Sequence, residues 1–361
     1  MISLRQLLDE MIKMRASDLH ISAGVPPQAR IDGSITPMGH PPLTPQMTQQ
    51  LAYSVLTEEQ RKRFETTKEL DLSFGVPGLS RFRANVFLQR GVTSMAIRQI
   101  PYEIFSCEQL GLPKTIRDLT QKQKGMILIT GPTGSGKSTT LAAMIDLINT
   151  SRAGHIITIE DPIEYVHHHK KCIVHQREIN SDTTTFATAL KYVLRQDPDV
   201  ILIGEMRDLE TIGAALTIAE TGHLVLATLH TNSAYESINR IVDAFPASQQ
   251  PQVLAQLAFV LEAVVTQQLI PRQRGPGRVM VAETLLCTAA VRAVIRERKT
   301  HQIYSLMQAG SKFGMQTMNQ GLFQAFVNKH ISLDEAMGRS SDVKELEGML
   351  EKVGVHINAA Y

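Results

Sequence analysis

From residue 125 onward, short apolar runs alternate with longer segments in which apolar residues recur every three or four positions. The short runs are typical of buried strands and the longer segments of helices. Strands are expected over 126–130, 156–160, 200–203 and 224–229, with a fifth over 279–285, and helices over 186–194 and 209–220. This alternation predicts a mostly parallel sheet with helices on both faces, in which ligands bind at the carboxyl ends of the strands. From about residue 289 the pattern is of helices only.

The first hundred residues have the mixed pattern of a small α/β domain. Its expected elements are a helix over 4–12, a hairpin turned at Asp32 and Gly33, a helix capped by Thr57 that runs through Phe64, and strands over 71–74 and 80–89 joined at Pro77 and Gly78. Such glycine-containing pairs favour the tight turns between antiparallel strands. Residues 101–113 are then a linker, so the expected domains are 1–100 and 114–289, followed by a helical region over 290–361.

Composition and charge narrow the class of protein. A chain of 361 residues, 43% of them hydrophobic, is long enough for two domains with sizeable cores. Its formal net charge of +2 gives no reason to expect nucleic-acid binding. The three cysteines form no CxxC pair, which favours neither a disulfide framework nor a cysteine zinc site and is consistent with a reducing cytoplasm. No apolar run approaches the length of a membrane-spanning helix, so no membrane insertion is expected.

The most specific motif is a phosphate-binding loop of the form G-x-x-x-x-G-K-[ST]. It consists of Gly131, Pro132, Thr133, Gly134, Ser135, Gly136, Lys137, Ser138 and Thr139. An expected strand precedes it and an expected helix follows it, and this context matters because the helix N-terminus adds its dipole to the phosphate site. The motif predicts ATP binding, with Lys137 reaching the β- and γ-phosphates and the Ser138 hydroxyl ligating Mg²⁺.

Further polar residues stand at the ends of the expected strands. Glu205 ends the third strand, where a second nucleotide-binding motif supplies a carboxylate for Mg²⁺. Glu160 and Glu164 follow the second strand; one of them could activate water, and the alternative is a solvated loop. His230 ends the fourth strand and could sense the γ-phosphate. Residues 167–175 hold four histidines and two lysines, and we expect a solvated turn between strands because their spacing is unlike that of zinc sites.

The loop and three further stretches together resemble the four signature boxes of the secretion and pilus ATPases; these stretches are 156–165, 195–208 and 221–231. Within this superfamily the chain is most similar to the PilT group of type IV pilus retraction ATPases, which residues 16–20 also fit. The type II secretion and pilus extension members of this superfamily are longer chains, and many carry a four-cysteine insert. This sequence resembles them in neither length nor cysteine content. Residues 290–297 resemble a motif of the retraction ATPases but depart from it at Val291, Ala293 and Val294.

The resemblance implies an α/β fold with a PAS-like N-terminal domain, a RecA-like P-loop ATPase domain and C-terminal helices. It implies a homohexameric ring in the cytoplasm, at the inner-membrane face of the pilus machine, that hydrolyses ATP to retract pili and power twitching motility. Arg81 and Arg83 match the strand that supplies arginines to the nucleotide site, and alternate strand residues share a face. They could instead be exposed strand arginines.

The partners implied by the resemblance are other copies of the chain, an inner-membrane pilus platform protein and a PilU-like paralogue. Two alternative functions stay open at this point. One is a PilU-like accessory ATPase, and the other is a different secretion ATPase of the same superfamily.

Overall fold

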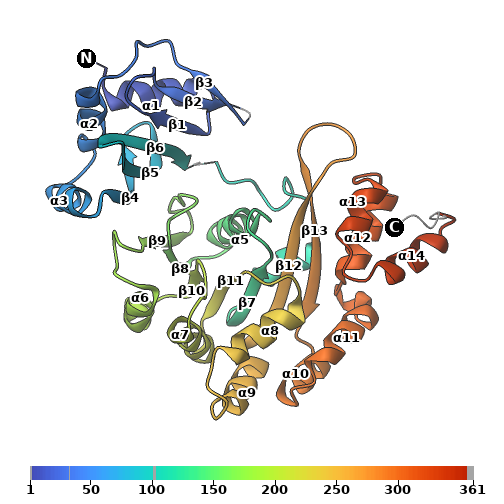
Figure 1. The fold of residues 1–361 in the computed structure, drawn as a ribbon. Helices are drawn as coiled ribbons and strands as arrows, with labels where there is room; N and C mark the ends of the chain where they lie inside the picture. The colour runs from blue at the N-terminus through green and yellow to red at the C-terminus, as the bar shows by residue number, and fades with distance from the viewer. Residues whose placement is uncertain (1, 32, 101–102, 356–361) are drawn as a thin grey trace. The chain divides into compact units, whose positions relative to one another are not determined.

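Two separate sheets organise the residues that the computed structural model describes, which are 2–31, 33–100 and 103–355 (Figure 1). Each sheet belongs to its own compact unit. The first unit comprises residues 1–103 with 164–166, and the second comprises 104–163 with 167–361. The turn residue Asp32 and the first two residues of the expected linker, 101 and 102, lie outside the described residues.

The first unit is built on an antiparallel sheet of six strands in the order β3-β2-β1-β6-β5-β4. The strands are β1 (Asp18–Ile21), β2 (Gln28–Ile31), β3 (Ser34–Pro37), β4 (Glu69–Val76), β5 (Ser80–Gln89) and β6 (Val92–Ile100). The helices are α1 (Leu4–Lys13), α2 (Pro45–Tyr53) and α3 (Glu58–Thr67). The antiparallel pairing of β2 with β3 and of β4 with β5 confirms the two hairpins expected from the sequence.

Helix starts in this unit follow directly from the sequence. The Thr57 side chain accepts a hydrogen bond from the Gln60 backbone and the Gln60 side chain accepts one from the Thr57 backbone, a capping box that confirms the expected start of α3. The helix continues past Phe64 to Thr67; this last turn is exposed and has no apolar residue, so the apolar pattern did not indicate it. It ends at Lys68, which adopts a left-handed conformation.

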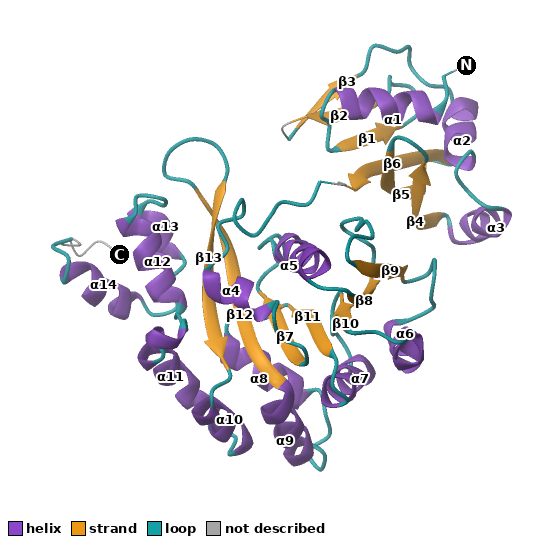
Figure 2. Cartoon of the chain, turned by 180° about the vertical axis from the view of Figure 1, so that it is seen from behind, coloured by secondary structure: helices purple, strands orange, loops and turns teal. Residues whose placement is uncertain are grey.

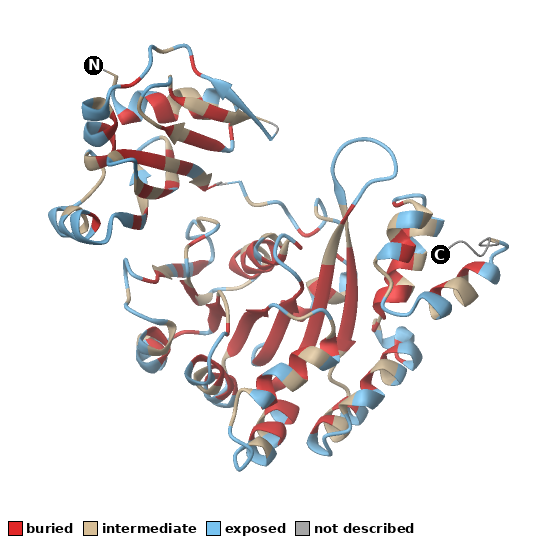
Figure 3. Ribbon diagram, in the orientation of Figure 1, coloured by how far each residue is buried: buried red, intermediate tan, exposed pale blue. Residues whose placement is uncertain are grey.

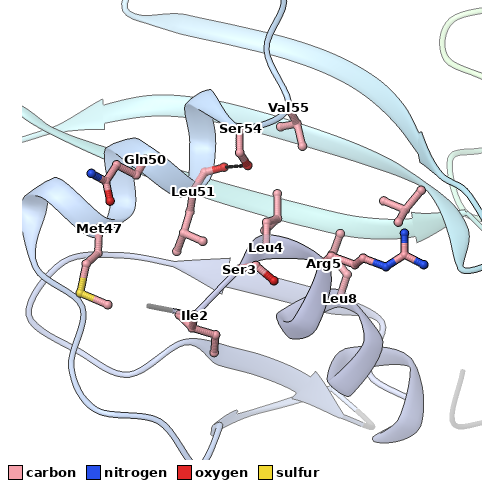
Figure 4. Close-up of a pocket in the computed structure, with 11 residues that line it drawn as sticks. Ile2, Ser3, Leu4, Arg5, Leu8, Met47, Gln50, Leu51, Ser54 and Val55 are labelled. Carbon is pink, nitrogen blue, oxygen red and sulfur yellow. Dashed lines mark hydrogen bonds between the residues drawn. The ribbon is translucent and has the colours of Figure 1, made fainter.

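The first unit also contains an apolar cavity of about 390 Å³ beside α1 and α2 (Figure 4). Its lining includes Leu4, Leu8, Met47 and Leu51, together with the Arg5 side chain. None of the residues that carry the sequence motifs lines it, so this cavity is separate from the candidate nucleotide site.

The second unit holds a sheet of seven strands in the order β13-β12-β7-β11-β10-β8-β9 (Figure 2). The strands are β7 (Gly125–Thr130), β8 (Gly154–Glu160), β9 (Cys172–Glu178), β10 (Val200–Ile203), β11 (Leu224–Leu229), β12 (Leu261–Pro271) and β13 (Arg278–Leu286). Neighbouring strands are parallel except that β13 runs antiparallel to β12. The mostly parallel sheet is therefore confirmed, with an antiparallel edge strand that the sequence pattern did not indicate.

Helices cover both faces of this sheet. They are α4 (Lys114–Leu119), α5 (Lys137–Ser151), α6 (Phe186–Val193), α7 (Leu209–Glu220), α8 (Ala234–Asp243) and α9 (Gln250–Val260). Along β7, Ile127 and Ile129 pack in a core with α4 and α5, whereas Met126 and Leu128 pack in a core with α6 to α9. The central strands are buried on both faces, which explains why they read as continuous apolar runs (Figure 3).

Two strands of the second unit differ from expectation. Residues 172–178, part of which was expected to be a solvated turn, form the edge strand β9. Cys172 and Val174 are buried there, whereas the intervening Ile173 and the following His175 are exposed. Only one face of the strand is therefore buried, and the charged, histidine-rich sequence around it did not indicate a strand. The strand β12 was not expected, because helix α9 passes into it at Leu261 without an intervening glycine or proline.

Five helices follow β13, as expected from the helical pattern after residue 289, within the described part of the chain. They are α10 (Ala289–Arg296), α11 (Ile303–Ala309), α12 (Met318–Val327), α13 (Leu333–Gly338) and α14 (Val343–Glu351). Helices α12 to α14 pack on β13 around a small core that includes Val281, Leu322 and Leu346. No helix among the described residues has the length and apolar character needed to cross a membrane.

A buried carboxyl group joins this helical region to the sheet. Glu283 of β13 is 3% exposed, and its Oε1 accepts a 2.7 Å hydrogen bond from the backbone N–H of Ala234 at the start of α8. It also accepts a backbone hydrogen bond from Met318 at the start of α12. Burial raises the pKa of Glu283 to about 7, although both hydrogen bonds favour the ionised form.

This raised pKa predicts a pH-dependent stability. Because the folded pKa of about 7 exceeds the ordinary value of 4.5, the contribution of Glu283 is complete below about pH 4.5 and is lost as the pH rises through 7. Between about pH 5 and about pH 8, the free energy of unfolding measured in urea should fall less for Glu283→Gln than for the unchanged protein, because glutamine does not ionise. Equal losses in the two proteins would contradict this role of Glu283.

Candidate nucleotide site

The phosphate loop joins the buried strand β7 to helix α5 in the second unit. Gly131, Gly134 and Gly136 have φ values of 137°, 78° and 88°, a region that side chains with a Cβ rarely adopt. Gly136 precedes the first residue of α5, and among the described residues no side chain caps that helix. The loop therefore leaves the first backbone N–H groups of a 15-residue helix available to an anion.

Lys137 lies inside this loop and is only 9% exposed. Its Nζ donates hydrogen bonds to the carbonyl oxygens of Gly131 at 2.8 Å and Pro132 at 3.0 Å. Burial lowers the pKa of Lys137, while the negative charge of Glu205 opposes that shift. The ammonium group is thus held by the loop itself and is electrostatically coupled to the carboxylate at the end of β10.

Glu205 follows β10 and is half-buried. Its Oε2 lies 2.7 Å from Nη2 of Arg207 and 3.5 Å from Nε2 of His230. Burial by itself would raise the pKa of Glu205, but the hydrogen bond from Arg207 and the positive charges of His230, Arg207 and Lys137 together hold that pKa below its usual range. The carboxylate is therefore ionised at neutral pH and is a suitable oxygen ligand for a divalent cation.

Glu160 is the last residue of β8, the strand that neighbours β10. Its Oε1 accepts hydrogen bonds from Oγ1 of Thr158 at 2.6 Å and Nε2 of Gln176 at 3.2 Å. A Cβ added to Gly204 would lie 3.2 Å from the Cα of Glu160, so the backbones meet closely just before Glu205. Glu164, in contrast, belongs with residues 165 and 166 to the first unit.

Strand pairing places these groups at one edge of the sheet. The register aligns Ile203 of β10 with Ile159 of β8 and with Ala227 of β11, and it aligns Leu229 of β11 with Thr130 of β7. The four strands therefore end side by side. In the second unit the structure brings together the phosphate loop, Glu160, Glu205 and His230.

Arg81 and Arg83 lie on β5 in the first unit. Their neighbours Phe82 and Ala84 are buried, so the two arginines share the opposite face of the strand, as the alternation predicts. Nη2 of Arg81 donates to Oγ of Ser73 at 2.6 Å, and Arg83 is exposed. Their role at the nucleotide stays a prediction.

Two residues that contact the site were missed in the sequence. Arg207 pairs with Glu205, and its only signal was an opposite charge two positions beyond the strand-end acid. Gln267 of β12 donates from Nε2 to the carbonyl oxygen of Ser135 at 2.8 Å. Gln267 gave no signal, because the strand that carries it was not expected.

These features define a P-loop protein with a RecA-like α/β unit and a separate N-terminal domain. The family model described as "Type II/IV secretion system protein" matches residues 1–338. The chain therefore belongs to the type II/IV secretion system protein family, which confirms the superfamily inferred from the four boxes.

Individual relatives agree with this assignment. The "Type IV pilus retractation ATPase PilT" of Pseudomonas aeruginosa is 48% identical over 321 residues, which cover 89% of this chain and 93% of that protein. The "Type IV pilus ATPase PilU" of the same organism is 42% identical over 346 residues, which cover 96% of this chain and 91% of that protein. A crystal structure of the pilus retraction motor PilT with bound ADP matches with a TM-score of 0.91 and 52% identity, covering 96% of this chain and 100% of that one.

The loop geometry predicts unequal effects of alanine at two of its glycines. A Cβ at Gly131 would lie 2.4 Å from the backbone oxygen of Gln267, whereas a Cβ at Gly134 would meet nothing within 4 Å. Gly131→Ala should therefore destabilise the protein by several kcal/mol, and Gly134→Ala should cost only the ~1–3 kcal/mol of an unfavourable φ. Urea unfolding of both variants checks this order, and equal losses would show that the close approach does not matter.

Proposed function

We propose that this protein is a motor ATPase that uses ATP hydrolysis to retract type IV pili. The observation that carries the proposal is the edge of the second sheet. There the phosphate loop, the buried Lys137 and the ionised Glu205 lie together. Similarity to PilT along 89% of the chain at 48% identity supports retraction as the work performed.

The bound nucleotide is ATP, held through backbone N–H groups of the phosphate loop and of the first residues of α5. The donor set fits Mg²⁺, because the Ser138 hydroxyl and the Glu205 carboxylate are the hard oxygen ligands that this cation prefers. When bound, the cation offsets negative charge on the phosphates. Lys137 supplies a further positive charge to the β- and γ-phosphates, for which it leaves its hydrogen bonds to Gly131 and Pro132.

Glu160 or Glu164 orients the attacking water. Glu160 is the stronger candidate, because it ends a strand of the unit that carries the phosphate loop and stands next to Gly204. His230, 3.5 Å from Glu205, senses the γ-phosphate from the end of β11. The turnover of Glu160→Gln and Glu164→Gln variants assigns the water-orienting role between the two carboxylates.

The first unit completes the site through Arg81 and Arg83 in a homohexameric ring. Because the arginines and the phosphate loop belong to different units, loss of the γ-phosphate releases a clamp and converts hydrolysis into movement of the units. The ring works in the cytoplasm, at the inner-membrane face of the pilus machine, and acts on the platform protein there.

A second candidate function is that of a PilU-like accessory ATPase. The observation in its favour is the extent of the match, since the similarity to PilU spans 96% of this chain and that to PilT spans 89%. The lower identity to PilU, 42% against 48%, favours the retraction motor.

The site predicts two different losses of activity. Lys137→Ala should abolish ATP turnover while the protein stays folded, because the main cation of the loop is removed. Glu205→Gln should still bind ATP but turn it over about a hundredfold more slowly or worse, because a neutral amide is a weaker ligand for the cation that offsets charge in the transition state. Phosphate release and circular dichroism check both variants, and near-normal turnover in folded Lys137→Ala protein would refute the site.

Deletion of the gene tests the direction of work. Cells that lack a retraction motor should carry abundant surface pili and show no surface motility, because fibres are assembled but not withdrawn. Electron microscopy and a motility assay give the two readouts, and a plasmid copy of the gene is the control. Bald cells would indicate extension instead, and normal pili with normal motility would point to an accessory or secretion role.

A further inference from the structure

Gln267 stands where β12 runs past the end of its neighbour β7. The parallel ladder between these strands ends with Thr266 aligned to Thr130, and their hydroxyl groups lie 2.8 Å apart. Gln267 is the next residue of β12 and is fully buried. It therefore lies beside the phosphate loop, which begins as β7 ends.

Gln267 approaches both ends of the loop. A Cβ on Gly131 would lie 2.4 Å from its backbone oxygen, and a Cβ on Gly136 would lie 3.2 Å from its Nε2. Between these points, Nε2 donates a 2.8 Å hydrogen bond to the carbonyl oxygen of Ser135. Gln267 thus restricts two positions of the loop to glycine, Gly131 through its backbone and Gly136 through its side chain.

The hydrogen bond to Ser135 also determines where a neighbouring donor points. In a trans peptide the carbonyl of one residue and the N–H of the next lie on opposite sides of the chain. With the Ser135 carbonyl directed at Gln267, the N–H of Gly136 is directed away from β12. That N–H immediately precedes α5, at the end of the helix that favours anions.

Two polar atoms of this contact are buried without a hydrogen-bond partner among the described residues. They are Oε1 of Gln267 and Oγ of Ser135. A buried polar atom without a partner costs about 1–3 kcal/mol, so the Ser135 hydroxyl points to a place where a polar ligand supplies the missing bond. The Ser135 hydroxyl can donate to a phosphate oxygen.

We propose that Gln267 is a positioning residue of the nucleotide site, which orients the Ser135–Gly136 peptide so that the loop binds the phosphates of a nucleoside di- or triphosphate. The inference rests on the proposed ATPase function and adds a residue from a strand outside the four sequence boxes. Gln267 acts through the loop backbone and does not itself contact the nucleotide.

The test uses Gln267→Leu and Gln267→Met, which keep the approximate volume and lose the amide donor. Both should weaken binding of a fluorescent ADP analogue about tenfold, the effect of a hydrogen bond worth about 1.4 kcal/mol. The KM for ATP should rise by a similar factor, and kcat at saturating ATP should change less than about threefold. Thermal unfolding without nucleotide measures the accompanying change in stability.

The matched control is Thr266→Val, which removes the neighbouring buried hydrogen bond to Thr130 without touching the loop. It should lower the unfolding temperature and leave the nucleotide affinity unchanged. Wild-type nucleotide affinity in both Gln267 variants would overturn this inference but not the proposed function. A loss of affinity in Thr266→Val equal to that in the Gln267 variants would do the same. If the unchanged protein binds no nucleotide, the proposed function fails first, and that outcome is visible in the same series.

Discussion

The parallel register of four strands is the constraint on which the rest of this protein depends. Because β7, β11, β10 and β8 pair in register, their carboxyl ends meet at one edge of the sheet. Residues that are up to 99 positions apart in the chain, from the phosphate loop to His230, are thereby brought to one place. Because alternate residues of these strands pack in two different cores, a shift of one residue would exchange the side chains of the two faces, so the same apolar packing that stabilises the sheet also aligns the site.

That alignment places opposite charges close together, so that each lowers the free-energy cost of burying the other. Lys137 is nearly buried, and an isolated buried ammonium group is costly. The loop carbonyls and the Glu205 charge offset part of that cost, while Arg207, His230 and Lys137 keep Glu205 ionised. The site thus holds one cation and one anion ready for a phosphate and its metal, and neither charge is stable there without the sheet that positions it.

Much of the second unit could be predicted because its signals are local. The strands at 200–203 and 224–229 and the helix at 209–220 have the expected bounds, since fully buried strands are continuous apolar runs flanked by breaks. The strand β9 was hidden because only one of its faces is buried, and β12 because it follows α9 without a turn. Gln267 could not be found for the same reason, since its role arises from a contact across 132 positions of sequence.

The strand pair β12–β13 connects the nucleotide site to the C-terminal helices. Gln267 on β12 supports the phosphate loop, and its antiparallel partner on β13 is Ala282, which immediately precedes Glu283. Glu283 in turn receives hydrogen bonds from the starts of α8, just after His230, and of α12. A displacement of the phosphate loop that moved β12 would therefore reach α12 through one hydrogen-bonded ribbon. Because the pKa of Glu283 is raised to about 7, the charge at this link changes near neutral pH.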